Sequence, residues 1–230
     1  MGSFKMDSIR NVVIMGHGKC GKTTLTEAML INSGAIDRMG KVAEGNTVSD
    51  FDAEEIKRQV SIQASMVPVE WKNMKYNFID TPGYFDFVGE VKEGLRAADS
   101  ALIVLSGRSG VSVGTEQVYK YARTKGVPIM FFVNKMDDDR ANYMNTLEQM
   151  KEKFGKAVTP FVIPIREGEK FKGYVDIVDM TARRYEGIER IDIPVPEGME
   201  DTIQPLRDMI MEAVAETDDA LMNKYFNGEE

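Results

Sequence analysis

Apolar residues occur along the chain in two alternating patterns, short continuous runs and longer stretches with the spacing of a helix. The continuous apolar or β-branched runs predict buried strands at residues 9–15, 76–79, 100–105 and 128–133. The stretches with helical spacing follow these runs, at residues 22–32, 87–95, 115–124 and 140–153. A weaker alternation over residues 61–71 predicts one more strand. We therefore expect an α/β fold with a doubly wound, mostly parallel sheet of five or six strands, covered by helices on both faces.

The first predicted strand and helix are joined by the glycine-rich stretch Gly16-His17-Gly18-Lys19-Cys20-Gly21-Lys22-Thr23. Glycines let the backbone curl so that successive N–H groups point at an anion, and the start of a helix adds its positive dipole end. In such a phosphate-binding loop Lys22 supplies the charge for the β- and γ-phosphates, and the Thr23 hydroxyl is a ligand for Mg²⁺. The stretch therefore predicts the P-loop NTPase form of the α/β fold. The alternative is a glycine-rich turn without a ligand.

Two further predicted strands end in short motifs that complement this loop. Asp80-Thr81-Pro82-Gly83 follows one strand. At this place Asp80 is a candidate for Mg²⁺ binding, and the Gly83 N–H can approach a γ-phosphate because no Cβ intervenes. Asn134-Lys135-Met136-Asp137 follows another strand, and the Asp137 carboxylate can accept two N–H bonds from a guanine edge, which adenine does not offer. Each motif alone is also compatible with a surface turn. Together, and in this order, they predict a site for GTP or GDP with Mg²⁺.

Two regions depart from this regular alternation. Residues 35–60 hold no period for long, and a connection of this length is typically functional or mobile, so a loop that orders on ligand binding is expected there. After Gly155 the pattern predicts a small α+β subdomain at residues 156–230, inserted beside a GTP-binding core at residues 1–155. Its expected elements are strands at 158–165, 172–178 and 183–187, a proline-containing loop at 191–198, a helix marked by Ile203, Leu206, Ile210 and Val214, and a short helix at 221–226.

Composition limits the functional classes that fit the chain of 230 residues. Apolar residues make up 43% and charged residues 29%, and no apolar run approaches the roughly 18 residues of a membrane span, so we expect a soluble protein. A net charge of −8 disfavours electrostatic binding of nucleic acid over a broad surface, and we expect no DNA or membrane partner. A single cysteine excludes an internal disulfide and agrees with a reducing, cytoplasmic location. We expect a monomer.

The sequence resembles the guanine-nucleotide domain of the translational GTPases, most closely elongation factor G and its ribosomal-protection relatives. The residues that carry the likeness are His17, Gly21-Lys22-Thr23-Thr24, Gly34-x-Ile36, Gly40-x-Val42, Arg58-Gln59-Val60-Ser61-Ile62, Asp80-Thr81-Pro82-Gly83-Tyr84-Phe85-Asp86-Phe87 and Val133-Asn134-Lys135-Met136-Asp137. Residues 156–230 are similar to the insert of elongation factor G. The resemblance implies a GTPase that hydrolyses GTP to GDP and phosphate, with Mg²⁺, on the ribosome. It also implies nucleotide contacts from the phosphate loop and from Thr24, Ser61, Thr81 and Pro82.

Four positions depart from the family pattern. Ser61 stands where the family has a threonine that closes on Mg²⁺ and the γ-phosphate, and the preceding family glycine is Gln59. Tyr84 replaces the histidine that positions the attacking water; its hydroxyl can orient water but cannot gain positive charge, so weak intrinsic hydrolysis is expected. Lys19 stands where an aspartate often helps to hold a monovalent cation, and its ammonium is a candidate substitute for that cation. The alternatives are that Tyr84 is only a packing residue of the switch, without a chemical role, and that Lys19 is only a solvated side chain at the rim of the loop.

Three functional interpretations follow from these residues. The favoured one is a ribosome-stimulated GTPase of the elongation factor G class that drives translocation, with Tyr84, Lys22 and Gly83 as the catalytic candidates. The second is a GTP-dependent switch that docks on the ribosome with little or no hydrolysis, or a ribosomal protection factor. The third, an ATP-using enzyme, is disfavoured by Asp137. The Ser-Ala turn that closes over guanine in this family does not follow Phe226, so we expect a piece of a longer factor, with low activity by itself.

Overall fold

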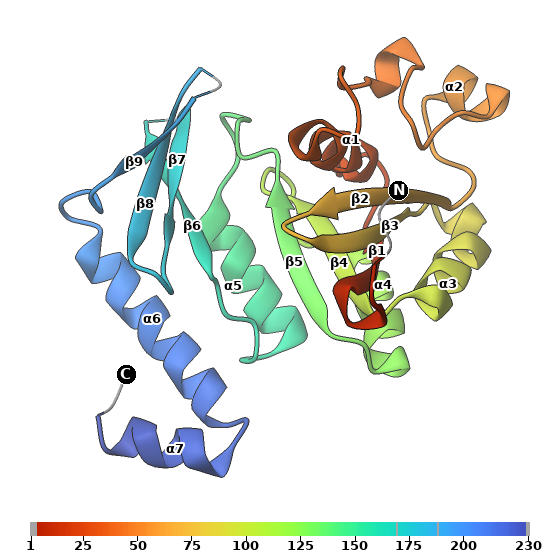
Figure 1. Cartoon of the computed structure of the whole chain (residues 1–230). Coiled ribbons are helices and arrows are strands. Elements are labelled where there is room, and N and C mark those ends of the chain that lie inside the picture. The colour runs from red at the N-terminus through yellow and green to blue at the C-terminus, as the bar shows by residue number, and fades with distance from the viewer. Residues whose placement is uncertain (1–3, 169, 188, 229–230) are drawn as a thin grey trace. The chain divides into compact units, whose positions relative to one another are not determined.

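The computed structural model describes residues 4–168, 170–187 and 189–228, and it divides the chain into two compact units. The first unit is Met1–Lys135 and the second is Met136–Glu230, and each is described here by itself (Figure 1). The division by backbone contacts falls before the expected boundary at residue 155, so that the helix after the Asn-Lys-Met-Asp motif belongs to the second unit. The assignment of residues 1–155 and 156–230 to separate functional domains remains a prediction.

The first unit is built on a five-stranded sheet with the order β2-β3-β1-β4-β5. Its strands are β1 (Ile9–Met15), β2 (Ser65–Trp71), β3 (Met74–Asp80), β4 (Ser100–Ser106) and β5 (Ile129–Asn134). Pairing is parallel from β3 through β1 and β4 to β5, and only the edge strand β2 runs antiparallel to its neighbour. The predicted fold class, an α/β fold with a mostly parallel sheet, is therefore confirmed.

Helices cover both faces of this sheet because side chains of a strand point alternately to opposite sides. The covering helices are α1 (Lys22–Ser33), α3 (Val88–Ala97) and α4 (Val113–Lys125), and a short helix, α2 (Ala53–Arg58), lies in the connection between α1 and β2. On one face Val13 and Met15 of β1 are fully buried with residues of α3 and α4, while Ile14 is buried on the other face with residues of α1. The parallel register places the carboxyl ends of β1, β3 and β4 side by side at one edge of the sheet.

Two turns in this unit follow the expected chemistry. Gly34, at φ 74, ends α1 as a left-handed cap, a conformation that glycine adopts readily. Lys72 and Asn73 join β2 to β3 with φ angles of 48 and 62, a conformation that suits a two-residue hairpin. The strand predicted over residues 61–71, however, begins only at Ser65. The reason is that the backbone N–H groups of residues 62 and 63 donate to the Glu55 carboxylate instead of to a neighbouring strand.

The long connection between α1 and β2 contains more regular structure than its sequence indicates. It holds a 3-10 turn, η2 (Val42–Glu44), and the six-residue helix α2, whose N-terminus is capped by Asp52 and Glu55 in a reciprocal capping box. This part of residues 35–60 therefore has regular structure although no period holds there in the sequence. A helix of six residues is too short to display a hydrophobic period, so only its capping residues mark it in the sequence.

The second unit combines helices with a four-stranded antiparallel sheet of order β6-β7-β8-β9. Its elements are α5 (Tyr143–Phe154), β6 (Val162–Glu167), β7 (Lys170–Asp176), β8 (Thr181–Glu186), β9 (Glu189–Ile193), α6 (Glu200–Ala215) and α7 (Asp219–Phe226). Residues 191–193, predicted to lie in a loop, instead end β9, because they pair with β8 before Pro194 removes the next donor. Helix α6 buries Ile203, Leu206 and Ile210 as predicted, whereas Val214 is 47% exposed.

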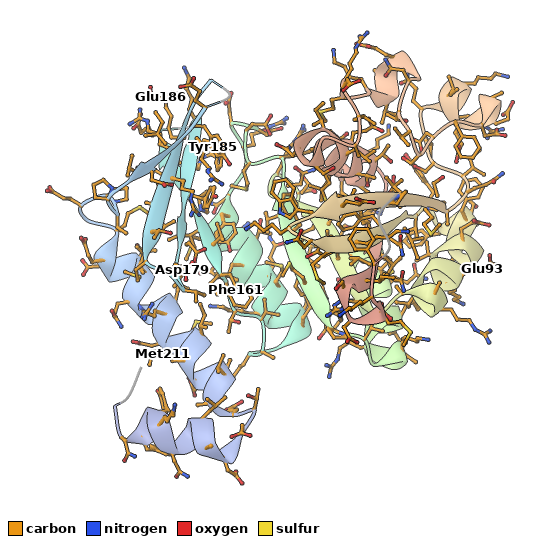
Figure 2. All side chains as sticks on the ribbon, viewed as in Figure 1. Glu93, Phe161, Asp179, Tyr185, Glu186 and Met211 are labelled. Carbon is orange, nitrogen blue, oxygen red and sulfur yellow. The ribbon has the colours of Figure 1, made fainter. Side chains whose placement is uncertain are left out.

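Aromatic rings gather on one part of this antiparallel sheet. Figure 2 labels Tyr185 on β8, whose ring centroid lies 6.2 Å from that of Tyr174 and 6.4 Å from that of Phe171, both on β7.

Within the described residues, neither unit contains a helix that is both long enough and apolar enough to cross a lipid bilayer.

Candidate functional site

The glycine-rich stretch forms a curled loop at the carboxyl end of β1, immediately before α1. Gly16 and Gly21 have φ angles of 150 and 97, and a Cβ on Gly16 would run into the Val104 carbonyl, so the close turn requires glycine at this position. The Lys22 side chain is 6% exposed, and its ammonium donates to the Gly16 carbonyl at 3.1 Å and to the His17 carbonyl at 3.3 Å. The loop therefore wraps around one buried positive charge, as a phosphate-binding loop does.

Asp80 lies at the end of β3 and accepts hydrogen bonds from hydroxyl groups of separate segments. In the parallel register it stands opposite Ile14 of β1. Its Oδ2 accepts hydrogen bonds from the Thr23 hydroxyl at 2.8 Å and from the Ser49 hydroxyl at 3.1 Å. The Thr23 and Ser61 hydroxyls are 3.2 Å apart. The structure thus brings together the three residues that the sequence nominated for Mg²⁺, namely Thr23, Ser61 and Asp80, and adds Ser49.

The second carboxylate oxygen of Asp80, Oδ1, is buried and has no hydrogen-bond partner among the described residues. Burial raises the pKa of Asp80 to about 6, while the Lys22 ammonium and the Thr23 hydroxyl act in the opposite direction. A buried carboxylate oxygen without a partner is energetically unfavourable unless a proton, a water or a cation satisfies it. Hydroxyl and carboxylate oxygens are the protein ligands that Mg²⁺ prefers, so these residues fit a magnesium ion.

Gly83 and Tyr84 lie against the phosphate loop. A Cβ built on Gly83 would lie 2.7 Å from the Gly18 backbone nitrogen and would also collide with the Lys22 ammonium, so only glycine fits there. The ring of Tyr84 packs on Gly18, where an added Cβ would come within 3.0 Å of it. The His17 ring lies beside Phe85, with centroids 6.2 Å apart. Gly83 and Tyr84 therefore both lie beside Gly18 of the loop, and their contact with a terminal phosphate remains a prediction.

Three buried acids that sequence reasoning missed lie in or against the long connection. Glu27 of α1 is fully buried and accepts hydrogen bonds from the backbone of Gly40 at 2.7 Å and of Val48 at 2.6 Å. Glu55 is 1% exposed and accepts from the backbone of residues 62 and 63. Asp50 is 5% exposed, and burial raises its pKa although the Ser61 hydroxyl counters this effect. In the sequence, Glu55 is marked by its spacing from Asp52 in the capping box, and Glu27 and Asp50 only by their position in or beside a segment without a period.

The guanine motif spans the junction of the two units. Asn134 ends β5, and its side-chain Nδ2 donates to the Cys20 carbonyl at 3.0 Å, which ties this strand end to the phosphate loop. Lys135 follows with φ 58. Met136 and the exposed Asp137 belong to the second unit. Lys22 and Asp80 thus lie at one strand edge as expected, while the convergence of Asp137 with them remains a prediction.

The fold and this site together define a P-loop nucleotide-binding domain. The family model of the elongation factor Tu GTP binding domain matches residues 7–219. The chain belongs to this family, and it is accordingly a GTP-binding domain of the GTPase type. Among solved structures, the crystal structure of ttk003000868 from Thermus thermophilus is similar, with 38% sequence identity and a TM-score of 0.92. The match covers 97% of this chain and 34% of that protein, so the chain spans about a third of the length of this relative.

Proposed function

We propose that the chain is the GTP-binding domain of an elongation factor G-like translation factor, which hydrolyses GTP to GDP and phosphate on the ribosome and thereby drives translocation. The single observation that carries this proposal is the cluster at the carboxyl edge of the sheet, where Lys22, Thr23, Ser61 and Asp80 meet inside a domain of the elongation factor family. The ribosome is the expected partner of the longer factor, which we expect to act as a monomer in the cytoplasm.

The proposed division of roles follows from the chemistry of each group. The loop backbone from Gly16 to Gly21, with Thr24, encloses the phosphates, and Lys22 neutralises the β- and γ-phosphates. The Gly83 N–H, with Thr81 and Pro82 fixing the turn before it, faces the γ-phosphate. The base is bound by Asn134, Lys135, Met136 and Asp137. The Asp137 carboxylate selects guanine by accepting hydrogen bonds from the N1–H and 2-amino groups of the base.

Thr23, Ser61 and Asp80 are the residues that would hold Mg²⁺, with Asp50 and Ser49 beside them. When bound, the ion neutralises charge on the β- and γ-phosphates. The chain's own contribution is to order the segment that carries Ser61. Glu27 and Glu55 supply this order, because each accepts backbone N–H groups of that segment.

Tyr84 favours a second candidate function, a GTP-dependent ribosome-binding switch with little hydrolysis. Its ring packs on the phosphate loop, and a phenol cannot become a cation at neutral pH as imidazole can. A ribosomal protection factor would share this behaviour. Single-turnover GTP hydrolysis with ribosomes, compared between the natural protein and its Tyr84→Phe variant, separates the cases. A rate that is unchanged in the variant removes the hydroxyl from the mechanism, and no ribosome-stimulated phosphate release at all favours the switch.

Lys19 gives a narrower proposal about cations. Its side chain is exposed, and its backbone has a positive φ of 63. We propose that its ammonium takes the place of a monovalent cation beside the oxygen that bridges the β- and γ-phosphates. GTP turnover should then be insensitive to potassium, and Lys19→Met should introduce potassium dependence. A strong potassium stimulation of the unsubstituted protein would exclude this role.

The nucleotide class has its own test, which does not involve ribosomes. A labelled guanine nucleotide bound to the chain should be displaced by unlabelled GTP and GDP but not by ATP, because adenine offers no pair of donors to Asp137. Equal displacement by ATP would contradict the assignment of Asp137.

A further inference from the structure

Arg166, on the first strand of the antiparallel sheet, reaches the loop that contains Asp137. Its Nη1 donates to the Met136 carbonyl at 3.0 Å, and its Nη2 donates to the Asp138 carbonyl at 3.4 Å. All of these residues belong to the second unit. The two carbonyls flank Asp137 in the chain, so the guanidinium is bonded to the backbone on both sides of the residue proposed to select guanine.

Several other hydrogen bonds of this loop are local. The Asp138 carboxylate accepts from the Arg140 backbone at 3.0 Å, and the Asp138 carbonyl accepts from the Ala141 backbone at 2.9 Å. Next to them, Asn142 caps α5 by accepting from the backbone of residue 145. Such bonds stabilise the turn through residues of the turn itself. Arg166, 28 and 30 positions further along the chain, joins the turn to a sheet.

The guanidinium suits this task better than other side chains. It presents several N–H donors in one rigid plane, so two donors can engage two acceptors at once, and it stays charged at any relevant pH. Hydrogen bonds from a charged donor are stronger than neutral ones. Arg166 also lines, with Ala141 and Asn142, a cavity of about 780 Å³ in the second unit. The side chain therefore lies between the loop and an open space and does not fill a closed core.

We propose that Arg166 is a positioning residue for guanine recognition, which holds the backbone around Asp137 so that its carboxylate is oriented before the base arrives. The inference rests on the proposed role of Asp137. A loop fixed on both sides loses less conformational freedom on binding, and the affinity for guanine nucleotides rises accordingly. The second unit thereby contributes to base selection through a contact inside itself.

The test compares GDP with inosine diphosphate, which keeps N1–H but lacks the 2-amino group. A well-placed carboxylate gains two bonds from guanine and only one from hypoxanthine, so the ratio of the two affinities reports its orientation. For Arg166→Ala we expect the dissociation constant to rise roughly 10-fold for GDP and about 2-fold for inosine diphosphate. The preference for GDP should thus fall about 5-fold. A general loss of stability would weaken both nucleotides equally.

Arg207 provides the matched control. Its Nη1 donates to the carbonyls of Ile177 and Val178, both at 3.0 Å, so Arg207→Ala removes a similar double contact of the same unit from another place. Arg207→Ala should leave the ratio unchanged. Arg166→Lys retains a charge but lacks the planar fork, and an intermediate ratio is expected. If Arg166→Ala does not fold, as judged by thermal melting, the Lys variant decides.

The outcomes separate this inference from the function on which it rests. An unsubstituted chain that binds GDP no better than ADP would contradict the proposed function itself. An unsubstituted chain that prefers GDP, with the same GDP-to-inosine ratio in the Arg166 variants, would overturn the role of Arg166 alone. An equal fall of the ratio in the Arg166 and Arg207 variants would also overturn it.

Discussion

The two units place their functional groups in different surroundings. In the first unit Lys22, Asp80 and Glu27 are buried, and hydrogen bonds connect each of them to other segments at the edge of a parallel sheet. In the second unit Asp137 is exposed on a turn, and Arg166 supports that turn from a distant strand. The groups proposed for phosphate recognition are thus part of the core, while the residue proposed for base recognition lies on the surface.

This difference has a consequence for mutagenesis. A substitution among the buried groups of the first unit alters both the free energy of unfolding and nucleotide binding, because the same contacts serve both. A substitution at an exposed turn residue changes the free energy of unfolding by less than about 0.5 kcal/mol and acts on binding alone. Four experiments test whether this separation holds.

The largest expected effect belongs to Lys22→Met. Loss of the buried ammonium removes charged hydrogen bonds to the phosphates, so the affinity for GDP and for inosine diphosphate should fall together by roughly 1,000-fold, about 4 kcal/mol. Equilibrium titration with a fluorescent nucleotide measures this loss. Lys120→Met, an exposed position on α4, is the control that should bind as the unsubstituted chain does. A loss confined to one base would contradict the assignment of Lys22 to the phosphates.

Asp80→Asn tests the buried carboxylate through the pH dependence of stability. The pKa of Asp80 is raised from 3.8 to about 6 in the folded chain, so between these values the folded chain holds more protons than the unfolded chain. The free energy of unfolding of the metal-free, nucleotide-free chain should therefore fall as pH rises from about 4 to about 6, by roughly 3 kcal/mol relative to Asp80→Asn. Urea unfolding at several pH values measures it. A difference between the two chains that does not vary with pH would contradict the raised pKa.

Asp137→Asn tests the exposed side of the comparison. An amide donates where the carboxylate accepts, so the affinity for GDP should fall about 30-fold, near 2 kcal/mol, through the loss of charged hydrogen bonds. The melting temperature should stay unchanged because the side chain is exposed. Calorimetric titration and thermal melting give the two quantities. A clear drop in melting temperature would show that base recognition is not separate from folding.

The smallest expected effect is that of Gly83→Ala. The added methyl group collides with the Lys22 ammonium and the Gly18 backbone, so the affinity for a non-hydrolysable GTP analogue should fall roughly 10-fold, a larger loss than that for GDP. Gly89→Ala is the matched control in α3, where a Cβ meets nothing within 4 Å. The control should bind normally and gain about 0.5–1 kcal/mol of stability from its better helix propensity. Equal weakening of the GTP analogue and GDP would argue against placement of Gly83 at the γ-phosphate.

The local features of the fold could be read from the sequence because their causes are local. Continuous apolar runs predicted the parallel strands, and the glycine spacing predicted the loop that encloses Lys22. The motif Asp80-Thr81-Pro82-Gly83 was predicted at a strand end and lies at one. In each of these cases the information is contained within a few residues, since periodicity, backbone conformation and capping depend on neighbours in the chain.

Only the tertiary structure decided which distant residues support these motifs. Glu27 bonds to the backbone of residues 40 and 48, Ser49 donates to Asp80, and Arg166 bonds to carbonyls of residues 136 and 138. No spacing in the sequence indicates such pairs, because an acid or an arginine in an irregular or amphipathic segment is ordinarily solvated. Their roles arise from burial and from long-range contact, which exist only once the chain has folded.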